Sequence, residues 1–246
     1  MAIYFPKGFT VAPPVFVTEG LIVKLDASDL ASYPGSGSVW NDISTDGTNY
    51  SGSIVNATFS TTAGGCFDLD GTGDYIQISH NNNLSFNTTT IKTMQMWVYF
   101  DTIATDDVLI NKLTAASGFD GYYLRVGAGG SLISSTNGLN TAKSYTSATG
   151  VVSAGNWYLI TFMGQIAVTA NSTRVYVNTT NVISGFHQTD SINESNNLLL
   201  GANLNRPSVS GNDANIKIGA FYFYNRFLNE EEIRRNFELT KSRYGV

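Results

Sequence analysis

The stretch NIKIGAFYFYNRFLNEEEIRRNFELTKSRYGV, residues 215–246, decides the fold. Its first ten residues alternate with a period of two, which predicts a β-strand that is covered on both faces. One face is expected to carry Ile216, Ile218, Ala220, Tyr222 and Tyr224, and the other Lys217, Gly219, Phe221, Phe223 and Asn225.

A helix is expected soon after this strand. Asn229 can serve as its N-cap, and Glu232 stands three residues later, as in a capping box. Leu228 and Ile233 are placed to form a hydrophobic staple across the cap. Acidic residues begin the segment and basic residues follow, which suits the helix dipole. The sequence therefore predicts a strand-rich chain that closes with one short, capped helix.

The composition fits one large all-β domain. The chain has 246 residues, of which 42 % are hydrophobic and only 13 % charged, and its net charge is −5. The basic residues are scattered, so the sequence argues against nucleic-acid binding. No apolar run reaches the roughly 18 residues of a membrane span. Cys66 is the only cysteine, which excludes an internal disulfide, and prolines near the N-terminus argue against a signal peptide.

Residues 1–19 are predicted to form an extended N-terminal arm, followed by one domain over residues 20–246. Residues 2–19 read AIYFPKGFTVAPPVFVTE, an apolar segment broken by three prolines, which remove hydrogen-bond donors and keep the chain extended. Such an arm cannot build its own core, so it lies either on this domain or on a neighbouring subunit. The candidate assembly contacts are Tyr4, Phe5, Phe9 and Phe16.

About a dozen short strands are expected between the arm and the helix, at spacings typical of a sandwich or jelly roll. They are residues 20–27, 53–59, 66–69, 75–79, 91–100, 108–113, 122–126, 131–135, 157–164, 174–177 (extending towards 183), 197–201 and 215–224. The apolar segment 91–100 is expected to be central, and residues 108–135 to form a meander. Residues 70–73, DGTG, are expected to connect a hairpin.

Several motifs follow one another in a familiar order. They are GLIVKLDASDLASYPGSGSVWNDIS (20–44), FDLDGTGDYIQI (67–78), MQMWVYF (94–100), GNWYLITF (155–162), RVYVN (174–178), LLLGA (198–202) and FYFYNRFLNEEEIRRNF (221–237). Together they resemble the concanavalin A-like, laminin-G-like jelly roll, an all-β sandwich of two antiparallel sheets. This subtype resembles modules of bacteriophage virion proteins and of secreted bacterial proteins. One departure is Asn178-Thr179-Thr180, where the family often has Asn-Gly, so a longer hairpin is expected there.

The sequence offers no catalytic residues. Glycoside hydrolysis needs two carboxylates about 5–9 Å apart, but no predicted strand has the Glu-x-Asp spacing of the lyticase-like members. Asp68 and Asp70 share one face of a strand and are interpreted as a sheet edge entering a turn. His80 and His187 have no nucleophile beside them and are interpreted as solvated, and Cys66 as a small buried hydrophobe. The chain is therefore predicted not to be an enzyme.

Calcium is the candidate cofactor, because the resemblance implies a metal at the rim of the sandwich. Asp70 and Asp74 bracket a glycine-rich turn and could supply two of the oxygen ligands that calcium requires. Asp26 and Asp29 are a second candidate pair. Turns use aspartate and glycine in any case, so the alternative is a purely structural role.

Glycan binding would use aromatic and amide side chains at a rim. The aromatic residues in or near predicted loops are Tyr33, Trp40, Tyr50, Tyr122 and Tyr145, whereas Trp97 and Trp157 lie within strands and are expected in the core. No residue is assigned as a sugar contact.

The resemblance and the arm together favour a virion structural protein, in the capsid or the tail. Its expected partners are other virion proteins and further copies of itself, with host surface polysaccharide at its outer rim. The alternative is an extracellular glycan-binding module of a secreted or cell-surface protein, and the third hypothesis is a glycoside hydrolase.

Overall fold

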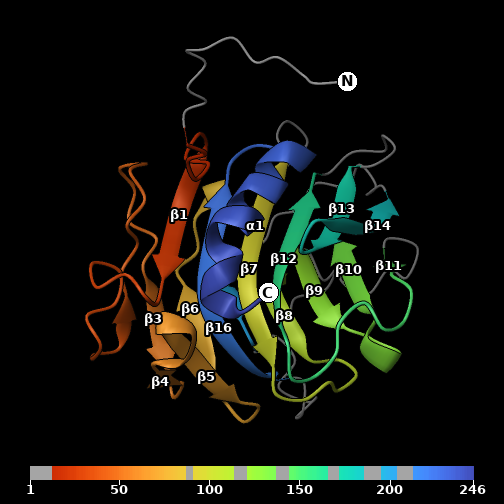
Figure 1. Cartoon of the computed structure of the whole chain (residues 1–246), viewed down its shortest axis with the longest axis horizontal. Helices are drawn as coiled ribbons and strands as arrows, with labels where there is room; N and C mark the ends of the chain where they lie inside the picture. The colour runs from red at the N-terminus through yellow and green to blue at the C-terminus, as the bar shows by residue number, and fades with distance from the viewer. Residues whose placement is uncertain are drawn as a thin grey trace, which may run out of the picture.

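Two antiparallel sheets lie face to face, and one helix lies across the outside of the first (Figure 1). The computed structural model describes residues 13–86, 91–113, 121–136, 144–165, 172–185, 195–203 and 213–246. The first sheet contains β1 (Leu21–Asp26), β4 (Thr58–Ser60), β5 (Cys66–Asp70), β7 (Lys92–Phe100), β12 (Trp157–Gly164), β13 (Thr173–Val177), β14 (Thr180–Gly185) and β16 (Asn215–Tyr224). The second contains β2 (Val39–Trp40), β3 (Gly52–Val55), β6 (Tyr75–Ile78), β8 (Val108–Leu113), β9 (Gly121–Val126), β10 (Leu132–Thr136), β11 (Ser144–Thr146) and β15 (Leu198–Leu200).

The strand order confirms the two-sheet sandwich. The first sheet runs β14-β13-β12-β7-β16-β5-β4, with β1 also paired to β16, and the second runs β11-β10-β9-β8-β15-β6-β3-β2. As predicted, β7 is central, between β12 and β16. The predicted meander is also confirmed, because β8, β9 and β10 pair in succession.

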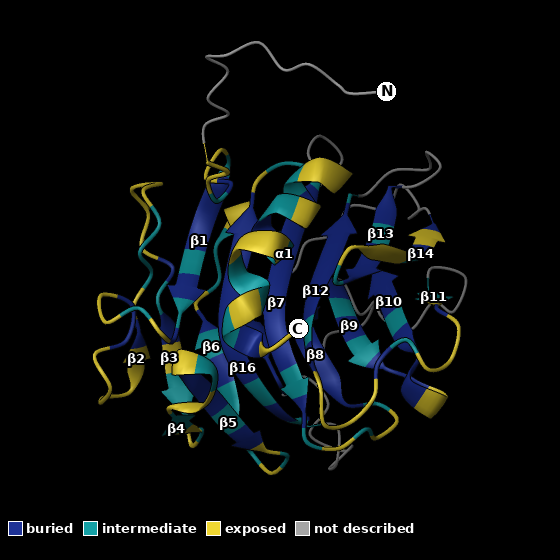
Figure 2. Cartoon of the chain, viewed as in Figure 1, coloured by how far each residue is buried: buried dark blue, intermediate teal, exposed yellow. Residues whose placement is uncertain are grey.

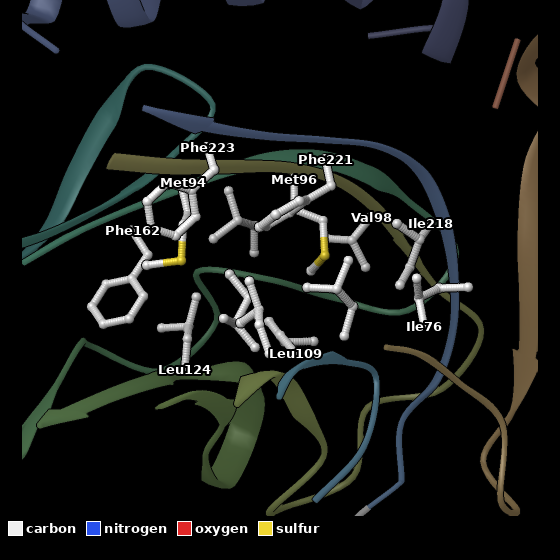
Figure 3. Packing of buried hydrophobic residues seen from close by; sticks show 14 of the residues in the cluster. Ile76, Met94, Met96, Val98, Leu109, Leu124, Phe162, Ile218, Phe221 and Phe223 are labelled. Atoms are coloured by element: carbon white, nitrogen blue, oxygen red, sulfur yellow. The ribbon is translucent and has the colours of Figure 1, made fainter. Parts of the chain in front are cut away.

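The main core fills the space between the two sheets (Figure 3). The first sheet contributes Met94, Met96, Val98, Phe162, Ile218, Phe221 and Phe223, and the second contributes Ile76, Leu109 and Leu124 among others. All of these side chains are buried. Each contributes about 1.5–3 kcal/mol through removal of its apolar surface from water.

The alternation along β16 changes phase at Gly219. Ile216 and Ile218 face the inter-sheet core, whereas Tyr222 and Tyr224 belong to the cluster beneath the helix. The register shifts between Ile218 and Ala220, which marks a β-bulge. The prediction that these residues share one face is therefore wrong, because an extra residue exchanges the two faces. Glycine suits this position, since a Cβ there would lie 2.6 Å from the Tyr244 ring.

Helix α1 (Glu230–Tyr244) forms a third layer over the first sheet. The predicted capping box is confirmed: the Asn229 side chain accepts from the Glu232 N–H, and the Glu232 carboxylate accepts from the Asn229 N–H. The buried face of the helix includes Ile233 and Tyr244, and its outward face is exposed (Figure 2). The Tyr244 ring stacks on Trp97, with 4.1 Å between centroids.

Across the described ranges, no helix combines the length and the apolarity that a bilayer crossing requires.

The described end of the arm is fastened to the body at Val17. The Val17 N–H donates to Asn236 Oδ1 at 3.0 Å, and its carbonyl accepts from the Tyr224 hydroxyl at 3.0 Å. Asn236 is itself buried and also donates to Gln95 Oε1 at 2.8 Å. Phe16 packs edge-on against Tyr222. The root of the arm is thus part of the layer between sheet and helix.

Two local predictions are wrong. Residues 53–59 were expected to form one strand, but the chain turns at Asn56, which has a φ of 56°, and β3 and β4 join different sheets. The hairpin between β13 and β14 was expected to be long, but Val177 pairs with Thr180 across only two loop residues. Asn178 permits this tight turn because asparagine tolerates its φ of 56°.

Candidate functional site

The rim of the sandwich carries a polar hollow of about 730 Å³ beside the turn from β5 to β6. It is lined by short polar and charged side chains, namely Asn56, Thr58, Asp68, Asp70, Thr72, Asp74, Asp101, Asn215 and Lys217. We call this site the rim hollow. Its lining comes from the β3–β4 segment, the β5–β6 segment, the end of β7 and the start of β16.

The turn over residues 70–74 joins the two sheets. β5 pairs with β4 and β16 in the first sheet, whereas β6 pairs with β3 and β15 in the second. The predicted hairpin is therefore wrong, although the predicted turn is present. Gly71 and Gly73 have φ values of 84° and 76°, which glycine adopts without strain. Turn residues determine that the chain reverses, but distant strands determine which sheet each end joins.

Carboxylates hold this turn in place. Asp70 Oδ1 accepts from the Thr72 N–H at 2.8 Å, and Asp74 Oδ2 accepts from the Asp70 N–H at 3.1 Å. Asp213 Oδ2 accepts from the Gly73 N–H at 3.0 Å. Burial raises the pKa of Asp74; the hydrogen bond from Asp70 N–H opposes this shift, and neighbouring carboxylates add to it.

Lys217 links two further carboxylates across the rim hollow. Its Nζ lies 3.0 Å from Asp68 Oδ2 and 2.7 Å from Asp101 Oδ2. Burial lowers the pKa of Lys217, but the hydrogen bonds to Asp101 and Asp68 outweigh it and the net pKa is raised. The lysine therefore remains an ammonium ion that donates to both aspartates.

The calcium hypothesis remains a prediction. Asp70 and Asp74 both line the rim hollow, as it requires. However, no group of three or more His, Cys, Asp or Glu side chains within the described ranges is arranged to hold a metal ion. The Lys217 ammonium also occupies the Asp68 and Asp101 oxygens that a cation would use.

The second candidate pair has other contacts. Asp26 Oδ1 lies 2.6 Å from the Arg243 guanidinium, in an ion pair that ties the end of α1 to β1. Asp29 Oδ1 accepts from the Ala31 N–H at 3.0 Å within its own turn.

The loop aromatics do not form an exposed platform. Tyr33, Trp40, Tyr50 and Tyr122 are buried, and Tyr145 packs half-buried against the core. Trp97 and Trp157 are buried, as predicted. The sequence reasoning missed Tyr99, a half-buried residue whose ring centre lies 5.7 Å from Lys217 Nζ.

His80 is not simply solvated, and this prediction is wrong. It is half-buried, and its Nδ1 lies 3.0 Å from Lys112 Nζ, which also donates to the Asn196 carbonyl. His187 lies outside the described residues. Cys66 is fully buried as predicted, and burial raises the pKa of its thiol to about 11.

Of the predicted arm contacts, Phe16 packs on this chain's own Tyr222. Tyr4, Phe5 and Phe9 lie outside the described residues.

A second hollow of about 560 Å³ adjoins the first and shares Asp101 with it. It is lined by Asp101, Thr102, Ile103, Gly129, Gly130, Gly150, Val152, Ser153 and Ala154. The rim therefore offers a polar depression beside a more apolar one, a combination suited to an extended ligand with hydroxyl groups and exposed C–H surfaces.

Asp101, Asn215 and Lys217 were also missed by the sequence reasoning. Lys217 could have been recognised, because it is a single charged residue within an otherwise apolar alternating strand. Asp101 directly follows the apolar strand β7, and it gains its role only because β7 and β16 are neighbours. Nothing local in the sequence gives that pairing.

The fold, with its polar rim, defines a lectin-type jelly-roll domain. The family described as the concanavalin A-like lectin/glucanases superfamily matches residues 70–234, and the chain belongs to this family. A comparison with curated protein sequences found no match.

Solved structures share the fold at low identity. Trypanosoma rangeli sialidase in complex with sialic acid has a TM-score of 0.69 and 16 % identity, over 99 % of this chain and 36 % of that chain. The binding domain of botulinum neurotoxin DC in complex with SialylT has a TM-score of 0.66 and 14 % identity, over 91 % of this chain and 52 % of that chain. The binding domain of Paraclostridial Mosquitocidal Protein 1 has a TM-score of 0.63 and 15 % identity, over 89 % of this chain and 52 % of that chain. The chain thus spans about a third to a half of these relatives.

Proposed function

We propose that this protein is a glycan-binding module that holds sugars in the rim hollow without cleaving them. The carrying observation is the gathering of carboxylate, amide, hydroxyl and ammonium groups in one hollow of about 730 Å³. Such groups can accept from and donate to sugar hydroxyls, and the Tyr99 ring centre lies 5.7 Å from the Nζ of the lining residue Lys217. Family membership supports this function, as do the glycan complexes named for the structural neighbours.

The charge of the rim hollow favours neutral sugars. Four aspartates and one lysine line it, so it carries an excess of negative charge. Anionic sugars would meet like charge in a partly desolvated site, which disfavours their binding. Neutral glycans are therefore the expected ligands, rather than the sialic acid bound by the trypanosomal sialidase.

The same contacts argue against cleavage. A glycosidase needs one carboxylic acid that is protonated before it donates. Asp68 and Asp101 both accept from Lys217 Nζ, and Asp74 is largely buried with its carboxylate bound to the turn. We therefore assign these groups to binding and to support of the turn.

A glycan array followed by calorimetry tests this proposal. The wild type is compared with Asp70→Asn and Asn215→Ala in the rim hollow, and with Asp46→Asn in an exposed loop as the matched control. Neutral glycans are expected to bind, and each rim variant to bind about tenfold more weakly, because one hydrogen bond to the sugar is lost. Equal weakening by Asp46→Asn, absence of binding, or release of reducing sugar on incubation would contradict the proposal.

We further propose that this module is displayed on a bacteriophage particle, in the capsid or the tail, and is anchored through its N-terminal arm. The support is the resemblance of the ordered motifs to phage virion modules and the apolar arm. The fastening of Val17 to Asn236 and Tyr224 adds a physical argument, because it would transmit any pull on the arm directly to the first sheet.

Incorporation into particles tests the virion role. A deletion of residues 2–12 leaves the Val17 contacts in place, so the body should fold as before. The full chain is expected to copurify with virions, and the shortened chain to be lost from them. Absence of the full chain from purified virions would refute the role, and normal incorporation of the shortened chain would refute the arm as the anchor.

A further inference from the structure

Another surface lies between the root of the arm and helix α1. A hollow of about 500 Å³ separates residues 13–15 from the outer face of α1. It is lined by Pro13, Pro14, Val15, Glu231, Arg234, Arg235, Glu238 and Leu239. We call it the helix hollow. Val15 and Leu239 both line it and are 68 % and 38 % exposed, so two large apolar side chains meet solvent at the same hollow.

Most charged side chains around the helix hollow form ion pairs within the described chain, but Arg235 does not. Glu231 pairs with Arg234 at 2.6 Å, and Glu238 pairs with Lys241 at 2.9 Å. Arg235 is half-buried, and its charge acts on Glu232, which is paired with Arg226; no carboxylate of the described chain lies within ion-pair distance of Arg235. The helix hollow therefore offers apolar walls and one available guanidinium, which binds aromatic faces and backbone carbonyls well.

The first twelve residues of the chain have matching chemistry. They read MAIYFPKGFTVA, with aromatic side chains at Tyr4, Phe5 and Phe9 and a single charge at Lys7. The apolar side chains suit Val15 and Leu239, and the aromatic rings suit Arg235. The lone lysine suits the acidic edge of the helix.

A segment that filled this hollow from within the same chain would have to reverse its direction beside Pro13 and Pro14. Residues 13–15 already form one of its walls. Pro13 and Pro14 favour an extended backbone, and a residue that precedes proline is biased away from the helical region towards extended conformations. A second copy meets no such restriction.

We propose that residues 1–12 of one copy bind in the helix hollow of a second copy. This extends the assembly role given to the arm above and is independent of sugar binding. A reciprocal exchange of arms closes a dimer, whereas a one-way exchange builds a ring or a chain.

Light scattering across a concentration series tests the exchange. The full chain is expected to reach at least twice the monomer mass, and Leu239→Asp in the full-length chain to remain a monomer. Leu30→Asp is the matched control, because Leu30 is 76 % exposed and does not line the helix hollow. Deletion of residues 2–12 should also give a monomer. A wild type that stays monomeric, or an equal effect of Leu30→Asp, would overturn the proposal; melting curves verify that each variant is folded.

Cysteine pairing identifies the occupant. The native Cys66 is fully buried, so only the introduced cysteines are accessible for disulfide formation. Phe9→Cys and Leu239→Cys are made in chains with tags of different mass, mixed and oxidised. A disulfide between the two chains is expected, whereas a bridge within one diluted Phe9→Cys/Leu239→Cys chain would show that the arm folds onto its own body. A Leu239→Asp variant that is monomeric and still binds glycan would show that arm exchange and glycan binding are independent of each other.

Discussion

Lys217 connects the first sheet to the chemistry of the rim hollow. Its strand position opposes Asp68 on β5 and Tyr99 on β7, so the side chains form a row across three strands. The ammonium lies within hydrogen-bond distance of both Asp68 and Asp101. Without it, two carboxylates would face each other at a partly buried rim. The lysine therefore sets both the shape and the charge of the site.

Lys217→Met is expected to lower the free energy of unfolding by about 1–2 kcal/mol at pH 7, given the partial exposure of both carboxylates. The pKa of Lys217 is raised in the folded state, so its contribution is present below its ordinary pKa and lost as the pH rises through the folded value. Above that value the lysine is neutral, so the cost of the variant should be smaller at strongly alkaline pH than at pH 7. Urea unfolding at both pH values measures this.

Lys241→Met is the matched control, since Lys241 forms an exposed pair with Glu238 and should change stability by less than about 0.5 kcal/mol. An equal loss at pH 7 and at strongly alkaline pH for Lys217→Met would mean that packing, not charge, explains its effect.

At the scale of elements, β16 and α1 organise the first sheet. β16 pairs with β7 on one edge and with β5 and then β1 on the other. The bulge at Gly219 marks the change from β5 to β1, and it lets the Tyr244 ring approach the strand. The helix, its capping box and most strands could be predicted because their signals are local. The bulge could not, because it depends on a ring 25 residues further along the chain.

Gly219→Ala is expected to destabilise the fold by about 1–3 kcal/mol, because its Cβ would meet the Tyr244 ring and force the ring away from Trp97. Tyr244→Leu in the same chain should remove much of that cost. Thermal or urea unfolding of the two single variants and the double variant measures the coupling. Strictly additive losses would show that the close approach is not the cause.

At the scale of the whole molecule, the sandwich brings separate segments to one rim. The sequence indicated the fold class and the turn with Asp70 and Asp74. It did not indicate that β5 and β6 enter different sheets, or that Asp101 and Lys217 would meet beside that turn. Pairing between strands more than a hundred residues apart decides those contacts. The glycine-rich turn could therefore be predicted from the sequence, whereas the charge and extent of the rim hollow depend on the order of the strands.

The most direct test of glycan binding in the rim hollow is a crystal structure with the neutral glycan that binds best on the array. Sugar density is expected in the rim hollow, with hydroxyl groups within hydrogen-bond distance of Asp70 and Asn215 and an intact glycosidic bond. Density on any other surface, or a cleaved sugar in the rim hollow, would contradict it.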